Sequence, residues 1–142
     1  MAPSQVYNAI SRYRQVRTEG SVEDANPHRL IAMLFDGALS RIALAAASMR
    51  RGEIEAKGAA ITRALEIVGA LRASLDMNVA GGLPQRLDAL YDYVSRRLLH
   101  ANIENDPKVL DEVAGLLRVI SDAWAQVAPS PRVAPCTNTP SS

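Results

Sequence analysis

The residues that could do chemistry in this sequence are few and widely spaced. It has two histidines, His28 and His100, and one cysteine, Cys136, which stands in a tail rich in Pro, Thr and Ser. Ala25 and Arg97 stand three positions before the histidines, so the Glu-x-x-His pairs of a di-iron bundle are missing. A reactive thiol needs an activating neighbour, and Cys136 has no histidine or acid near it in sequence. We therefore expect no catalytic residue, no cofactor and no metal site.

The remaining polar residues form no catalytic constellation. Asp36 and Asp92 each follow an aromatic residue within a helical pattern, but neither has a second acid or a base at a useful spacing. We expect them to serve as caps or in interhelical hydrogen bonds. A His phosphotransfer protein needs one exposed histidine, yet neither His28 nor His100 is followed by a lysine and a small residue one turn later. A phosphotransfer or metal-binding bundle stays as the alternative to a binding protein.

The composition favours a helical, non-enzymatic protein of the reducing cytoplasm. The chain of 142 residues is 48% hydrophobic but only 4% aromatic, which suits packed helices rich in Ala, Leu, Val and Ile. A net charge of +1 gives no argument for nucleic acid. No signal peptide is visible, and no apolar run approaches the ~20 residues that would span a bilayer, so we expect no membrane insertion. A lone cysteine agrees with a cytoplasmic location.

Helix start and stop signals divide the chain into segments. Asn26-Pro27 and Asp106-Pro107 each combine a good N-cap with a proline at the first helical position. Gly52 ends the first helix, and the second must turn back beside it because the connection is so short. Apolar residues at helical spacing then predict helices at residues 26–51, 53–75, 83–105 and 106–128.

These elements predict an all-α fold, an antiparallel four-helix bundle over residues 26–128. Residues 1–25 form an N-terminal segment in which Val6, Ile10 and Tyr13 could lie on one face of a short helix, followed by a polar loop. So short a helix needs a surface to dock on. Residues 129–142 contain several prolines and too little apolar sequence to fold, so we expect a disordered tail.

The apolar faces of the predicted helices are wider than mutual packing requires. A second row lies beside the expected core row of each helix, and such rows predict grooves of exposed apolar surface that bind a partner. Those grooves could also be covered by residues 1–25 or pair two copies in a weak homodimer. The competing interpretation is that Ala-rich bundles tolerate broad faces and nothing binds. The flanking rows contain Met33, Leu44, Ala60, Ala64, Ile67, Leu71, Tyr93, Val119 and Ala123.

Several segments, in order, resemble one family. Residues 26–39, Asn-Pro-His-Arg-Leu-Ile-Ala-Met-Leu-Phe-Asp-Gly-Ala-Leu, resemble the first-helix signature of the flagellar secretion chaperone FliS family. Residues 90–99, Leu-Tyr-Asp-Tyr-Val-Ser-Arg-Arg-Leu-Leu, are similar to its third helix. Further likenesses lie at Tyr13-Arg14-Gln15-Val16, at Gly81-Gly82, at Ala101-Asn102 and between Asp111 and Trp124.

The resemblance implies a cytoplasmic, non-enzymatic type III export chaperone. Such proteins are antiparallel bundles that bind the C-terminal polymerisation segment of flagellin, prevent its premature polymerisation and deliver it to the flagellar export gate. The family docks on the gate protein FlhA through an N-terminal tyrosine and the apolar residue three positions before it, which match Tyr13 and Ile10 here. An anti-sigma factor is a further partner compatible with the same grooves.

Overall fold

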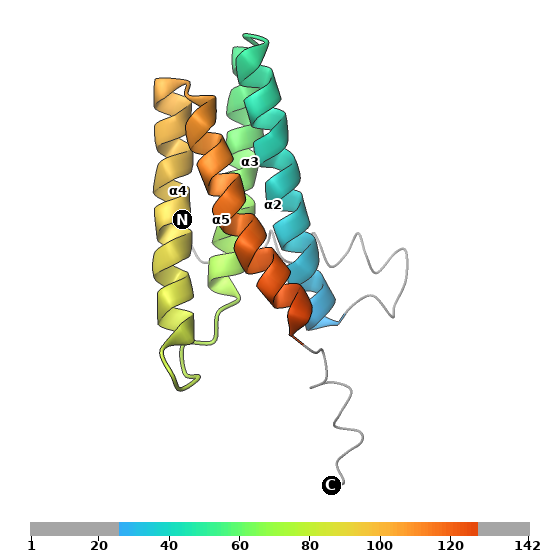
Figure 1. Cartoon of the computed structure of the whole chain (residues 1–142), viewed down its shortest axis with the longest axis vertical. Coiled ribbons are helices and arrows are strands. Elements are labelled where there is room, and N and C mark those ends of the chain that lie inside the picture. The colour runs from blue at the N-terminus through green and yellow to red at the C-terminus, as the bar shows by residue number, and fades with distance from the viewer. Residues whose placement is uncertain (1–25, 128–142) are drawn as a thin grey trace, which may run out of the picture.

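The protein is an all-α bundle of antiparallel helices. The computed structural model describes residues 26–127, which contain no strand. Each helix packs against two neighbours, α2 and α4 both lying between α3 and α5 (Figure 1). The fold class predicted from the sequence is confirmed, whereas residues 1–25 and 128–142 lie outside the described part of the chain. The helices are α2 Pro27–Arg50, α3 Ile54–Ala73, α4 Leu83–Glu104 and α5 Pro107–Gln126.

The helix starts follow from local hydrogen bonds. The side chain of Asn26 accepts from the backbone N–H of Arg29 at 2.8 Å, and that of Asp106 accepts from Lys108 at 3.0 Å. Both caps satisfy N–H groups that have no partner within the helix, and both precede a proline that needs none. Gly52 ends α2 with a φ of 73°, a left-handed conformation that costs glycine little.

The core is aliphatic, with one pair of aromatic rings. Phe35 of α2 and Tyr91 of α4 lie with ring centroids 6.5 Å apart. Burial of such side chains stabilises the fold by about 25 cal/mol per Å² of apolar surface. The large side chains that are almost fully buried are Leu34, Phe35, Ile42, Ile61, Ile67, Val68, Leu71, Val94, Leu98, Leu110, Val113 and Leu117.

At the starts of α3 and α4, two residues that the apolar pattern places in the core rows are exposed instead. Ile54 is 71% exposed and Leu83 is 58% exposed. Each is the first residue of its helix, where the neighbouring helices no longer cover the side chain. The core rows of α3 and α4 therefore begin farther along each helix than the apolar pattern predicts.

The C-terminal end of α5 is attached to the start of α2 by a histidine–tryptophan pair. Trp124 Nε1 donates to the carbonyl oxygen of His28 at 2.9 Å, and His28 Nε2 lies 3.1 Å from the carbonyl oxygen of Trp124. The two rings stack with centroids 4.8 Å apart. Because a carbonyl can only accept, Nε2 carries the hydrogen in this contact. His28 therefore has a structural role at the base of the bundle.

A buried lysine attaches α3 to the end of α4. The Lys57 side chain is only 7% exposed, and its Nζ donates to the carbonyl oxygen of Asn102 at 3.1 Å and to Asn105 Oδ1 at 3.0 Å. Asn105 takes a φ of 55° and ends the helix. A cation at this position also interacts favourably with the negative end of the α4 dipole.

Helix α2 is more apolar than the sequence analysis allowed. By length and composition it could cross a membrane, so the expectation that no segment reaches that limit was wrong. Core helices of water-soluble bundles pass the same test, and α2 packs against α3 and α5. Part of its apolar content nevertheless faces outward, since Leu44 is 42% exposed.

The Lys57 contacts predict a specific stability change. Replacing Lys57 with Met keeps the length of the side chain but leaves the end of α4 without its donor. We expect a loss of about 1–3 kcal/mol in the free energy of unfolding, measured by urea denaturation. Lys108→Met, at an exposed lysine, is the matched control and should change stability by less than about 0.5 kcal/mol. Equal midpoints for the two variants would contradict the capping role of Lys57.

Candidate partner-binding surface

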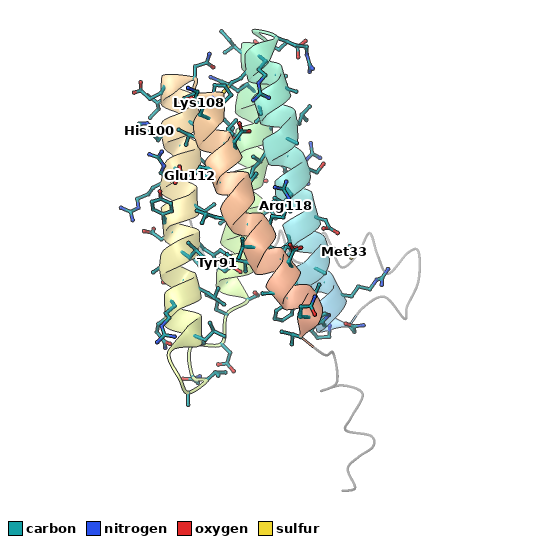
Figure 2. All side chains as sticks on the ribbon, viewed as in Figure 1. Met33, Tyr91, His100, Lys108, Glu112 and Arg118 are labelled. Carbon is teal, nitrogen blue, oxygen red and sulfur yellow. The ribbon has the colours of Figure 1, made fainter. Side chains whose placement is uncertain are left out.

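A polar contact fixes which faces of α4 and α5 meet. Tyr93 of α4 donates through its hydroxyl to Glu112 Oε2 of α5 at 2.7 Å. Arg97, one turn later in α4, donates from Nη2 to Glu112 Oε1 at 3.1 Å. Figure 2 shows Glu112 on the side of α5 that faces α4. These bonds close the space between the two helices near their connecting turn.

Away from that contact, apolar side chains recur at helical spacing on the same side of each helix. Leu90 and Leu83 stand seven and fourteen positions before Arg97, so they lie on the same side of α4. On α5, successive turns after Glu112 place Leu116, Val119 and Ala123 on the side that Glu112 occupies. We call the surface formed by Leu83, Leu90, Leu116, Val119 and Ala123 the α4–α5 seam.

The seam is open to solvent because α5 crosses the bundle obliquely. Figure 1 shows α5 starting beside the end of α4 and finishing beside the start of α2. Val119 is 69% exposed and Leu83 is 58% exposed, while Leu90 and Leu116 are half-buried and Ala123 is exposed. Exposed apolar side chains that share one side of a helix mark a candidate partner-binding site.

The flanking residues predicted from the sequence differ in how far they are exposed to solvent. Val119 and Ala123 are exposed as expected. Tyr93 is half-buried, and its hydroxyl is occupied by Glu112. The expectation of exposure was wrong for the α3 row, whose members are at most 2% exposed. That row consists of Ala60, Ala64, Ile67 and Leu71.

The α3 row is buried because α3 lies between two helices. The apolar pattern predicts a core row on α3 that includes Ile61 and Val68. That row covers only part of the surface through which α3 contacts α2 and α4. The buried face of the helix is centred between that row and the supposed flanking row, so both are used in packing. In this structure these four residues offer no surface to a partner.

The hydrogen bonds to Glu112, which close one end of the seam, depend on pH because Glu112 must be ionised to accept them. The hydrogen bond from Tyr93, followed by that from Arg97, lowers the pKa of Glu112 below its usual value. The same hydrogen bond to Glu112 is the main cause of the raised pKa of Tyr93. Both shifts favour the state in which an ionised Glu112 accepts from a neutral tyrosine and a cationic arginine.

The opposite side of α4 is held by ion pairs to α3. Arg72 donates to both carboxylate oxygens of Asp88 and, at 3.3 Å, to Asp92. Asp92 also pairs with Arg96 at 3.1 Å. The hydrogen bond from Arg72 is the main cause of the lowered pKa of Asp88. The prediction that Asp92 makes interhelical hydrogen bonds is confirmed, whereas Asp36 is exposed on α2.

A second surface feature lies on the other side of α5. Between α2 and α5 runs an open furrow of about 350 Å³. The sequence analysis named Met33 and Leu44 on α2 but missed this furrow, because its small residues look like ordinary core positions. Alanines recurring on facing helices were the available signal. We call this feature the α2–α5 furrow; it is lined by Leu39, Ile42, Ala43, Ala46, Leu110, Asp111, Ala114 and Arg118.

Within residues 26–127, no cluster of metal-binding side chains lies beside these surfaces. His100 is exposed on α4, and within residues 26–127 no three His, Cys, Asp or Glu side chains gather as metal ligands. The residues predicted to dock on the export gate, Ile10 and Tyr13, lie outside the described range. The fold and the exposed side chains place the chain in the class of antiparallel helical bundles with exposed apolar surface.

Comparison with known proteins identifies the family. The profile of the family described as Flagellar protein FliS matches residues 9–131, and the chain belongs to that family. It is 44% identical over 123 residues to the flagellar secretion chaperone FliS of Salmonella typhimurium, covering 86% of this chain and 91% of the relative. It is 46% identical over 116 residues to FliSB of Pseudomonas aeruginosa, covering 82% and 92%. FliS of Bacillus subtilis is 36% identical over 127 residues, covering 89% and 91%. The protein is therefore a flagellar export chaperone and not an enzyme.

The Glu112 contacts predict a stability change that depends on pH. Because the folded pKa of Glu112 lies below the ordinary value of 4.5, its stabilisation is complete above that value and is lost as the pH falls through the folded pKa. Glu112→Gln should therefore unfold at lower urea than the wild type at pH 7, and the difference should shrink towards pH 3, as measured by circular dichroism. Glu104→Gln, at an exposed position, is the control. An equal difference at both pH values would rule out this role for Glu112.

Proposed function

We propose that this chaperone binds the C-terminal polymerisation segment of flagellin along the α4–α5 seam. It does so in the cytoplasm, where it prevents premature polymerisation and delivers flagellin to the export gate. The observation that carries the proposal is the 69% exposure of Val119, an apolar side chain on the same side of α5 as Leu116 and Ala123. The proposal also rests on family membership, since the relatives are named flagellar secretion chaperones.

The shape of the seam suits a segment that folds as it binds. Such a segment loses chain entropy on ordering and recovers it by burying apolar surface, at about 25 cal/mol per Å². A long, shallow surface supplies more contact area to an extended chain than one deep pocket does. In this proposal, binding and release depend only on apolar contacts and local charge, so neither step requires a nucleotide.

Delivery is assigned to the N-terminal segment. We infer that Ile10 and Tyr13 contact the export-gate protein FlhA, because they match the family's N-terminal docking motif. The bundle begins at Asn26, two residues before His28, which pairs with Trp124 of the last turn of α5. Weak self-association and binding of an anti-sigma factor stay predictions of the sequence analysis.

The seam is tested by placing a charge in it. Val119→Asp should leave the fold intact, because the side chain is already exposed. We expect it to weaken binding of a flagellin C-terminal segment by about tenfold or more, since the new carboxylate would have to be desolvated in the complex. Titration calorimetry measures the affinity, and size exclusion shows whether a one-to-one complex forms.

The matched control for this variant is Ile103→Asp. Ile103 is 78% exposed near the end of α4, and its position in the helix places it away from the α5-facing side. It receives the same chemical change outside the seam and should bind as the wild type does. Failure of the wild-type protein to bind flagellin would refute the proposed function, while equal loss in both variants would place the site elsewhere.

The gate assignment is tested separately. Ile10→Ala combined with Tyr13→Ala should leave the unfolding midpoint and the flagellin affinity unchanged. The same double variant, loaded with flagellin, should bind the soluble domain of the gate protein at least about tenfold more weakly, as expected when two apolar anchors are removed. An unaltered affinity for the gate protein would exclude these two residues as the docking contact.

A further inference from the structure

The last turns of α5 are thinly covered by the rest of the bundle. The four buried residues of α5 all precede position 118, and none of residues 118–127 is buried. Ile120 and Trp124 are half-buried and pack against the core. A helix end with so few buried contacts opens locally at a lower free energy than the whole bundle unfolds. We call residues 118–126 the α5 end segment.

The start of α2, beside this segment, is thinly covered as well. The first buried residue of α2 is Leu34, seven positions after the helix begins. His28 and Trp124 join the two helix ends through hydrogen bonds of 2.9 and 3.1 Å and through stacked rings. Figure 1 shows both ends at the same end of the bundle. The contact therefore holds together two helix ends that the core itself covers little.

The same contact lies away from the seam but on the segment that carries part of it. Trp124 and Val119 are five positions apart in α5, so their side chains point about 140° apart around the helix. Trp124 faces His28, whereas Val119 is 69% exposed. Val119 and Ala123 both belong to the α5 end segment. A partner bound to these two residues would therefore depend on the contact without touching it.

We propose that the His28–Trp124 pair is a latch that positions the α5 end segment for its client. When the latch is closed, Val119 and Ala123 complete the seam. When it is open, the segment separates from α2 while residues 107–117 stay packed. The apparent affinity for flagellin is then reduced in proportion to the closed fraction. The inference rests on the proposed function and makes His28 a positioning residue that acts through α5.

The local charges make His28→Asp a selective way to open the latch. An ionised carboxylate can only accept, so it cannot bond the carbonyl oxygen of Trp124. It would also face the C-terminal end of α5, which carries the negative end of that helix dipole. In the first turn of α2, by contrast, a carboxylate interacts favourably with the dipole. The substitution therefore breaks the contact without weakening α2. His28→Gln keeps an amide donor for the same carbonyl.

The first test measures the opening by native-state hydrogen exchange, followed by NMR. Backbone amides of residues 121–124 should exchange through a local opening that depends little on urea, while those of Val113 and Leu117 should require global unfolding. His28→Asp should speed exchange at residues 121–124 by at least about tenfold. His100→Asp makes the same change at the exposed histidine of α4 and should leave these amides unaltered. Equal urea dependence at all these amides would overturn the inference.

The second test measures affinity and the state of the latch together. His28→Asp should bind the flagellin C-terminal segment at least about tenfold more weakly by calorimetry, while His28→Gln should stay within about threefold of the wild type. His100→Asp should bind as the wild type does. Trp124 is the single tryptophan of the chain, so its emission reports the latch. His28→Asp should shift that emission to the red, and a tryptophan-free flagellin segment should reverse the shift by selecting the closed state.

The results separate the latch from the proposed function. If the wild type does not bind flagellin, the proposed function is wrong, and hydrogen exchange alone decides whether the latch opens. If the wild type binds and His28→Asp binds equally well despite a red-shifted Trp124, the latch does not control the seam and the inference is wrong. Loss of helicity throughout His28→Asp, seen by circular dichroism, would also overturn it, because the pair would then support the whole bundle.

Discussion

The two attachments of α5 are the constraint on which the surface of this bundle depends. Near its start, Glu112 accepts from Tyr93 and Arg97, which holds α5 against α4. At its end, Trp124 exchanges hydrogen bonds with His28, which holds α5 against α2. A straight helix fixed to different neighbours at its two ends must cross the bundle obliquely. Its flanks therefore cannot both be packed along their whole length.

Exposed apolar surface follows from this crossing without any unusual composition. On the α4 side the helices separate beyond Glu112, and Val119 projects where no side chain of α4 covers it. On the α2 side the helices stay in contact, but small residues such as Ala43 and Ala114 leave an open furrow. The two surfaces lie on opposite sides of one helix.

Local signals predicted the helices well, since caps and prolines act within a few residues. Asn26 and Asp106 form the hydrogen bonds expected of N-caps. It was harder to predict which apolar residues are buried. An apolar pattern shows which side of a helix is apolar, but not how many neighbouring helices cover that side. Ile67 and Leu71 are buried since α3 has a helix on each side. The furrow depends on small residues of two different helices, so the spacing of residues in either helix alone does not predict it.

Residues of the core and residues of the proposed client surface lie close together in sequence. Leu117 is fully buried, while Val119, two positions later, is 69% exposed. Ile42 and Leu44 on α2 show the same division. Two positions correspond to about 200° around a helix, so one residue packs in the core while the other faces outward. Because the core is complete without the exposed row, the bundle stays folded before its client arrives. Substitutions in the exposed row should therefore change the stability of the bundle less than substitutions in the core do.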